Sequence, residues 1–341
     1  MEKELQRLLR EKYGVCAERI LPIQRGFYGE TWRAEGPECA YFIKCDFWAH
    51  HQDIYRVSLA AVDFLTAHGI DFVPRVHRTL DGWLFAHFRN GVVAVFEFVP
   101  GQLPEDCPPE TLYGLLARVY RLPAQTCSLP REDFGTGVLA EYAALRQNPR
   151  VPEEIKALLG RFEPRLSGYA QRLKQFSTLC QGDASGFCLT HGDAGGNCMY
   201  DEEKWSIVDW DSAALAPIER DAWIFLCEKE NLQRVQKTLA ENGVSYAFRT
   251  ERLCYYCYRF FFYYLTAYLR ALIEKENADA RAMLPREMAE FLIGYWINAR
   301  MNAADDAAKQ NKQEKRASPK SGGARYGFGK GQFRLFSRRM T

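Results

Sequence analysis

The pattern of apolar residues changes along the chain at Pro100-Gly101. Before this point, short apolar runs are separated by turn residues, and one segment at about 52–67 has helical spacing. After it, most apolar residues recur at intervals of three and four over long stretches, which is typical of helices. A change from sheet-rich to helical sequence indicates a boundary between two lobes. We therefore predict an α+β fold with two lobes, at 1–99 and 100–302.

The N-terminal lobe is expected to hold a small antiparallel sheet and one helix. Asn90-Gly91 is a strong signal for a β-hairpin. The helix should end at His68-Gly69, because glycine readily takes the left-handed conformation that ends helices. The expected strands lie at 31–34, 41–45, 73–79, 83–87 and 92–98.

The second lobe is expected to be larger and mainly helical. A run of aromatic residues at 253–269 has the spacing of a buried helix, so core packing is favoured over a surface that stacks a sugar or a base. Cys254 and Cys257 lie in this run, and we expect them to pack in the core rather than bind a metal. The expected helices lie at 109–121, 136–147, 152–160, 162–180 and over most of 220–302, with two short strands near 197–209.

The end of the chain differs in composition from the rest. Residues 307–341 carry ten basic side chains and one acidic one, whereas the whole chain has a formal net charge of +2, so the remainder is acidic. Such a segment lacks the apolar residues for a core. We predict a disordered basic tail at 303–341 that is solvated. Its interleaved aromatic residues leave contact with nucleic acid as a less favoured alternative.

Composition also limits the class of protein. The chain has eleven scattered cysteines, and its first residues, MEKELQRLLREKYG, are polar rather than a hydrophobic signal. We predict a reduced, cytoplasmic protein with no membrane partner. The oligomeric state is left open.

The segment from Leu189 to Asp211 carries the most specific chemistry. Short strands at 198–200 and 205–208 are separated by a polar turn, and a hairpin would bring Asn197 next to Asp209. Amide and carboxylate oxygens are the ligands that Mg²⁺ prefers, so the sequence predicts a magnesium site there.

Asp193 lies four residues before Asn197, across a loop that contains Gly195 and Gly196. This spacing lets one carboxylate face a substrate hydroxyl while the amide faces the metal. A positioned metal and a positioned nucleophile are the parts that phosphoryl transfer needs.

Three motifs in this region resemble the aminoglycoside phosphotransferase family. They are His191-Gly-Asp193 followed by Asn197, then Ile207-Val-Asp-Trp-Asp211, and finally Leu215-Ala-Pro-Ile-Glu-Arg-Asp221-Ala-Trp. The third is most similar to the spectinomycin phosphotransferase branch, and the chain also resembles the spore-coat kinase-like proteins. The resemblance implies a bilobal protein-kinase-like fold. It also implies ATP-dependent transfer of the γ-phosphate to a hydroxyl of a small molecule, such as an aminoglycoside-like antibiotic, an amino alcohol, a sugar or a related metabolite.

The resemblance also assigns roles to residues in these motifs. It implies that Asp193 is the general base, that Asn197 and Asp209 bind Mg²⁺, and that Asp221 braces the catalytic loop from behind. His191 is expected to brace the same loop rather than to transfer a proton. Two roles remain open for Asp211, a second metal ligand or a helix cap.

The N-terminal lobe would supply the nucleotide contacts. By resemblance, Lys44 is the lysine that binds the ATP phosphates, and the turn with Gly26 and Gly29 covers them. Glu97 and Val99 lie where the two lobes connect, and their backbone groups would bind adenine.

One departure from the family concerns the helix after Lys44, which usually carries a glutamate that pairs with the lysine. Ser58 stands at that position, and the nearby acids are Asp53 and Asp63, of which Asp63 would fit only in a shifted register. The partner of Lys44 is therefore left open. The missing glutamate motivates the alternative of a catalytically weak nucleotide-binding pseudokinase or scaffold.

The acceptor is not identified by the sequence. Acidic residues beyond the catalytic loop could attract a cationic acceptor, although each could instead belong to a solvated face. These residues are Asp211, Glu219, Glu228 and Glu230.

Overall fold

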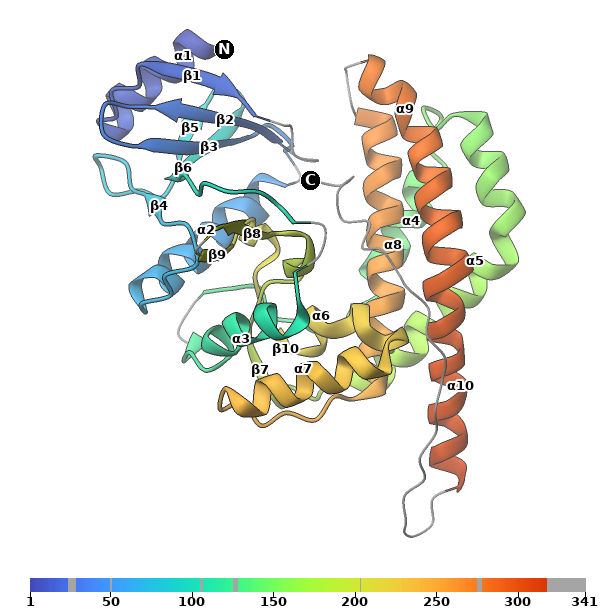
Figure 1. Ribbon diagram of the computed structural model, residues 1–341. Coiled ribbons are helices and arrows are strands. Elements are labelled where there is room, and N and C mark those ends of the chain that lie inside the picture. The colour runs from blue at the N-terminus through green and yellow to red at the C-terminus, as the bar shows by residue number, and fades with distance from the viewer. Residues whose placement is uncertain are drawn as a thin grey trace.

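The computed structural model describes residues 1–23, 29–49, 51–104, 107–124, 128–202, 204–274 and 278–317. In the first lobe, an antiparallel sheet has the strand order β1-β2-β3-β6-β4, and β5 also pairs with β6 (Figure 1). Its strands are β1 Arg19–Pro22, β2 Gly29–Glu35, β3 Ala40–Asp46, β4 Val76–His77, β5 Ala86–Phe88 and β6 Gly91–Glu97.

The two faces of this sheet pack against different helices. Ile43 and Cys45 of β3 belong to a core with α1 (Glu2–Leu8) and the π-helical turn that follows it. Phe42 packs with α2 (Gln52–Ala67) and the second lobe. Because side chains alternate along a strand, Lys44 lies on the same face as Phe42. The alternation thus directs Lys44 toward the second lobe.

Two further pairs of strands lie in the second lobe. Strands β8 (Cys198–Asp201) and β9 (Lys204–Ile207) form the hairpin that the sequence predicts. Strand β7 (Phe187–Thr190) pairs antiparallel with β10 (Ala214–Pro217), which the sequence analysis did not predict. The hairpin joins the core of α2 and the sheet, so both lobes share one hydrophobic cluster.

Helices form the rest of the second lobe. In Figure 1 the long helices α5, α8 and α10 stand side by side, away from the sheet. The helices are α3 Pro109–Tyr120, α4 Gly137–Arg146, α5 Glu153–Cys180, α6 Glu219–Ala222, α7 Lys229–Glu241, α8 Thr250–Glu274, α9 Ala278–Met288 and α10 Met301–Ala317, with a π-helical stretch at Ala289–Arg300.

Helix α5 corrects the predicted pair of helices at 152–160 and 162–180. It runs unbroken for 28 residues with Pro164 inside it. Its buried side, from Ile155 to Phe176, packs in one cluster with α8, and this packing along the whole length offsets the helix-breaking tendency of proline.

The aromatic helix and the chain end also bear on the predictions. Cys254 and Cys257 of α8 are buried in the core, and no cluster that could hold a metal through three His, Cys, Asp or Glu residues occurs in the described part of the chain. Helix α10 continues to residue 317, so residues 303–317 are helical rather than disordered, because Ala304 and Ala308 pack against the aromatic cluster. The remainder of the predicted tail lies outside the described residues. None of the described helices is long and apolar enough to span a membrane.

Candidate active site

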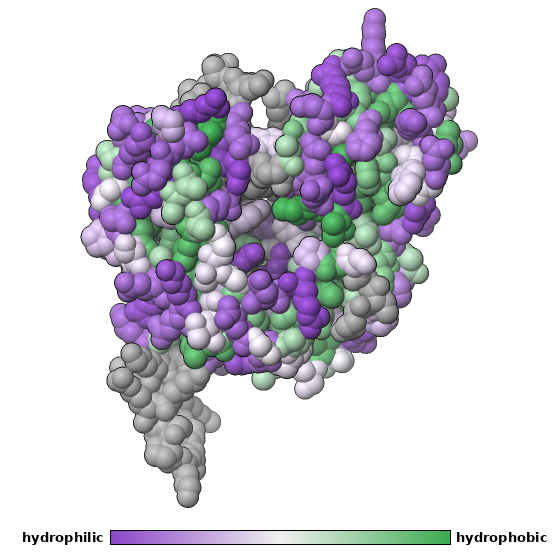
Figure 2. All heavy atoms as spheres, turned by 180° about the vertical axis from the view of Figure 1, so that it is seen from behind, coloured by the Kyte–Doolittle hydropathy of each residue, from purple (hydrophilic) through white to green (hydrophobic). Residues whose placement is uncertain are grey.

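Two pairs of strands bring two loops together between the lobes. Residues 191–197 connect β7 to β8, and residues 208–213 connect β9 to β10. Because β7 pairs with β10 and β8 pairs with β9, the two loops must lie side by side. Figure 2 shows the surface hollowed between the two lobes.

The hairpin places the predicted metal ligands next to one another. The backbone N–H of Val208 donates to the Asn197 carbonyl at 2.9 Å, which leaves Asp209 beside Asn197. The Asn197 amide nitrogen donates to the Asp193 carbonyl at 2.7 Å, so the amide oxygen lies on the other branch of this buried side chain. Asp209 has a left-handed backbone, with φ of 59°, which is uncommon for a residue other than glycine. One amide oxygen and one carboxylate fit a Mg²⁺ ion that takes its other ligands from phosphates and water.

His191 links the two loops. Its Nδ1 accepts the backbone N–H of Asp193 at 3.1 Å, and its Nε2 lies 2.9 Å from the Val208 carbonyl. Because Nδ1 accepts, the ring is neutral and Nε2 donates. Burial lowers the pKa of His191, which favours this neutral form. The ring also packs against Trp210 at 4.6 Å between centroids.

Asp221 lies behind the catalytic loop. Its carboxylate accepts the backbone N–H groups of His191 at 3.1 Å and Gly192 at 2.5 Å, and the hydroxyl of Tyr120 at 2.9 Å. Asp221 thus holds the backbone of this loop at His191 and Gly192.

Arg220 also holds this loop, and the sequence analysis gave it no role. Its guanidinium donates to the Thr190 hydroxyl at 3.1 Å and to the Ser212 carbonyl at 2.5 Å, so it bridges the end of β7 and the loop between β9 and β10. Gly192 lies so close that an added Cβ would be 2.4 Å from the guanidinium. The sequence feature that could have indicated this role is the charged run Glu219-Arg220-Asp221 between apolar residues.

Lys44 meets the second lobe through two carboxylates. Its Nζ lies 2.8 Å from Asp209 Oδ1 and 2.5 Å from Asp211 Oδ2. Asp211 is thus paired with Lys44, a contact that the two predicted roles, metal ligand and helix cap, did not include. No side-chain cap is recorded for the short helical turn that contains it.

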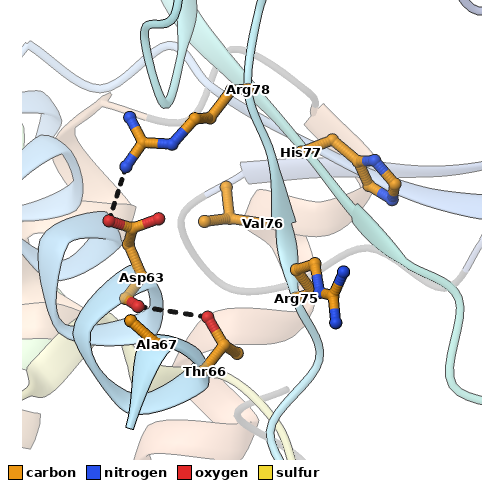
Figure 3. A pocket seen from close by; sticks show the side chains of 7 residues that line it. All are labelled: Asp63, Thr66, Ala67, Arg75, Val76, His77 and Arg78. Carbon is orange, nitrogen blue, oxygen red and sulfur yellow. Dashed lines mark hydrogen bonds and ion pairs between the residues drawn. The ribbon is translucent and has the colours of Figure 1, made fainter.

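Helix α2 offers Lys44 an aromatic ring in place of an acid. The Tyr55 ring centroid lies 5.6 Å from Lys44 Nζ. Ser58 is buried, and its hydroxyl donates to the Tyr55 carbonyl at 2.7 Å. Asp63 is paired with Arg78 at 2.6 Å, across an open pocket of about 390 Å³ between α2 and β4 (Figure 3). The shifted register that would have paired Asp63 with Lys44 is therefore wrong.

Charge and burial set the protonation states of the site. The side chain of Asp193 is exposed, yet the loops around it displace much of the bulk water, and this desolvation together with the Asp209 charge raises the pKa of Asp193 to about 7. Desolvation also raises the pKa of Asp211, to about 6, although Lys44 opposes it. For Asp209, desolvation opposes ionisation, but Lys44 outweighs it and lowers the pKa. Lys44 stays cationic, because the two carboxylates outweigh its desolvation and raise its pKa.

The connection between the lobes follows β6. The backbone N–H of Glu97 donates to the Arg75 carbonyl at 2.8 Å, so it is already used, and only the carbonyl of Glu97 could serve adenine. Val99 lies two residues further, on the way to α3. Gln102 exchanges backbone hydrogen bonds of 3.0 and 2.9 Å with Tyr200 of β8, which ties the connection to the β8–β9 hairpin.

Gly29, one of the two glycines of the predicted phosphate-covering turn, packs closely on β3. Gly29 is the first residue of β2, and an added Cβ there would lie 2.5 Å from the Cys45 carbonyl oxygen. The position therefore requires glycine for close packing on β3. Gly26 lies outside the described residues.

Tyr264 of α8 lies near Asp193. Most aromatic residues of this helix are core, as the spacing indicated, but Tyr264 is only half-buried. Burial and then the Asp193 charge raise the pKa of Tyr264, which indicates that it lies near that carboxylate.

Glu219, one of the acids suggested for a cationic acceptor, is fully buried and bonded to Tyr246 and the Arg249 backbone, so that suggestion is wrong for Glu219.

A family model described as the phosphotransferase enzyme family matches residues 19–255, which include both lobes of this site. The chain belongs to this family. The predictions of the family and of a phosphotransferase enzyme are thereby confirmed. The sequence matches no curated protein.

Solved structures of related enzymes have the same fold. Spectinomycin phosphotransferase, in complex with ADP and spectinomycin, aligns with a TM-score of 0.71 at 19% identity, over 91% of this chain and 99% of its own. Amicoumacin kinase, in complex with AMP-PNP, Ca²⁺ and its antibiotic, aligns with a TM-score of 0.59 at 14% identity, over 87% of this chain and 94% of its own. A macrolide 2'-phosphotransferase from Brachybacterium faecium gives 0.54 at 13% identity, over 85% and 97%. These alignments confirm the predicted bilobal, kinase-like α+β fold.

Proposed function

We propose that this phosphotransferase moves the γ-phosphate of ATP to a hydroxyl group of a small molecule. The observation that carries the proposal is the meeting of Lys44 with Asp209 across the two lobes, at 2.8 Å, beside the loop that holds Asp193 and Asn197. The lysine that would bind phosphates, the two residues that would bind a metal and the carboxylate that would act as base thus lie in adjoining segments. Phosphoryl transfer depends on such positioning and on charge stabilisation more than on covalent chemistry.

Each residue would have a separate task. Lys44 would bind the ATP phosphates, and Asn197 with Asp209 would hold Mg²⁺, which when bound neutralises charge on the phosphates. The exposed carboxylate of Asp193 would accept the proton of the acceptor hydroxyl, and its raised pKa suits a general base at neutral pH. Asp221 and Arg220 would keep the loop in place, and the backbone at Glu97 and Val99 would bind adenine.

The acceptor would bind between Asp193 and α8. The half-buried Tyr264 and its neighbours Tyr263, Phe291 and Tyr295 form an aromatic wall on that side. The relatives that contain spectinomycin and amicoumacin make hydroxyl-bearing antibiotics reasonable first candidates. We include amino alcohols and sugars in the same class of acceptor.

The proposal is tested by ATP turnover with Mg²⁺ against a panel of such hydroxyl compounds. We expect Asp193→Asn to lower kcat by at least about 100-fold, the usual lower scale of general-base catalysis. Asp201→Asn is the matched control, because this exposed carboxylate lies at the far end of the same hairpin. A smaller loss for Asp193→Asn would contradict its role as the base. Nucleotide binding without transfer to any compound would favour a pseudokinase instead.

A further inference from the structure

The two acidic residues of α2 are paired with arginines and are therefore unavailable to Lys44. Asp53 pairs with Arg56 at 3.0 Å, and Asp63 pairs with Arg78. Within the described residues, the recorded carboxylate partners of Lys44 all come from the loop after β9. The lysine is therefore positioned from the second lobe rather than from the helix of its own lobe.

This arrangement creates a conflict at Asp209. In the proposed function, Asp209 is a metal ligand, yet it also lies 2.8 Å from Lys44 Nζ. A lysine with no other partner would neutralise the carboxylate that the metal needs. Asp211 resolves the conflict, because its Oδ2 is closer to the same ammonium, at 2.5 Å.

Asp211 is also held firmly enough to serve as an anchor. Trp210 before it donates its ring N–H to the Ile207 carbonyl at 2.9 Å. Ser212 after it is held at its carbonyl by Arg220. The side chains of Lys44 and Asp211 are only 13% and 18% exposed, so water screens their attraction weakly.

Resting on the proposed function, we propose that Asp211 is the positioning residue for Lys44, in place of a carboxylate on α2. By holding the ammonium, Asp211 keeps Lys44 directed at the phosphates and leaves Asp209 free for the metal. Tyr55 completes the arrangement, since its ring covers Lys44 and its hydroxyl donates to the Lys44 carbonyl at 3.3 Å.

The competing role for Asp211 is that of a second metal ligand, and the two roles predict different couplings. An anchor acts on the metal only through Lys44, whereas a ligand acts on the metal directly. A cycle of Asp211→Asn, Lys44→Met and the double variant separates them. The readout is the Mg²⁺ concentration that gives half-maximal binding of a non-hydrolysable ATP analogue, measured by calorimetry without any acceptor.

We expect Asp211→Asn to raise this Mg²⁺ midpoint by about tenfold, the scale of losing a hydrogen bond between charged groups. In the Lys44→Met background the same change should have little effect, because no ammonium is left to compete for Asp209. An equal rise in both backgrounds would show a second metal ligand, and no rise in either would show that Asp211 positions nothing. Both outcomes overturn the proposal. Lys44→Gln provides a second background if Lys44→Met does not fold.

Moving the carboxylate to α2 gives an independent test. Tyr55→Glu added to Asp211→Asn would place an acid beside Lys44 from the helix of its own lobe, and we expect the Mg²⁺ midpoint to return toward that of the original protein. Ile54→Glu is the matched control, because Ile54 is the preceding residue of α2 and its side chain is exposed. Thermal unfolding of each variant identifies any that fails to fold, in which case the cycle decides alone.

The readout also separates this proposal from the proposed function. A protein that binds Mg²⁺ and nucleotide but transfers phosphate to no compound would contradict the proposed function and leave the Asp211 result standing. A protein that shows no Mg²⁺-dependent nucleotide binding would contradict both.

Discussion

Tyr120 of α3 donates its hydroxyl to the carboxylate of Asp221 at 2.9 Å, and the same carboxylate accepts the backbone of the catalytic loop. Three donors thus converge on two oxygens of one side chain. The ring of Tyr120 is buried in the core of the second lobe, so the position of Asp221 is fixed by packing as well as by hydrogen bonds. The loop that carries Asp193 is therefore built on the hydrophobic core.

Replacing Asp221 tests how much the loop depends on this carboxylate. Asp221→Asn keeps one acceptor oxygen but turns an NH₂ group toward a donor, so we expect the free energy of unfolding to fall by about 3 kcal/mol, the upper range for a hydrogen bond to a charged group. Tyr120→Phe removes a single donor and should cost about 1 kcal/mol. Urea unfolding measures both. A variant Asp221→Asn as stable as the original protein would contradict the bracing role.

Gly192 and Gly195 form a matched pair within the catalytic loop. Gly192 has a φ of +92°, and an added Cβ would lie 2.4 Å from the Arg220 guanidinium, whereas nothing lies within 4 Å of one at Gly195. We expect Gly192→Ala to destabilise the fold by at least about 2 kcal/mol, since the left-handed backbone alone costs about 1–2 kcal/mol. Gly195→Ala should stay within about 0.5 kcal/mol of the original protein. Thermal unfolding distinguishes them, and equal melting temperatures would be the contrary result.

The part of the site that the sequence predicts is the part built from local structure. Asn197 and Asp209 meet through a hairpin of neighbouring strands, and a turn signal with alternating residues is enough to place them. The roles of these residues remain predictions. The bounds of α2 follow in the same way from helical spacing and a terminal glycine.

Contacts between distant segments left no such signal. Lys44 and Asp211 are 167 residues apart, and their pairing depends on how the two lobes dock. The pairing of β7 with β10 also depends on tertiary structure. The same holds for α5, which continues as one helix across Pro164. In each case tertiary packing determines the structure, and the local conformational preference of the sequence either opposes that structure or does not encode it.

The neutral state of His191 predicts a dependence of stability on pH. Burial lowers its pKa in the folded state below the unfolded value of 6.5, so on acidification the unfolded chain binds the proton first. The contribution to stability is present above pH 6.5 and is lost as the pH falls below that value. For His191 alone, we expect the contribution to the free energy of unfolding to decrease between pH 7 and pH 5 by up to about 1.4 kcal/mol for each unit of pKa difference. The raised pKa values of Asp193 and Asp211 act in the opposite direction.

The variant His191→Gln isolates this contribution. It keeps a side-chain acceptor and donor but cannot titrate, so its deficit in stability relative to the original protein should become smaller from pH 7 to pH 5. His68→Gln is the control, because the His68 side chain is exposed on the surface and lies outside the catalytic loop. An unchanged pH dependence in His191→Gln would contradict the neutral, accepting state of the ring.

Tyr264 allows a test of where the acceptor binds. Within the described residues its hydroxyl has ring neighbours but no recorded hydrogen bond, whereas the hydroxyl of Tyr255, on the same helix, donates to the Gly135 carbonyl at 2.8 Å. If the acceptor lies beside Asp193, Tyr264→Phe should raise KM for the acceptor by about tenfold and leave KM for ATP unchanged, since a polar group of the acceptor would lose its partner. Tyr255→Phe should do the opposite, with an unchanged acceptor KM and a loss of about 1 kcal/mol in stability. Steady-state kinetics with any acceptor found in the panel decides the matter. A residue that contacts only the acceptor changes the acceptor KM without changing the ATP KM. An equal effect of Tyr264→Phe on both KM values would therefore show that the acceptor does not bind against this aromatic wall.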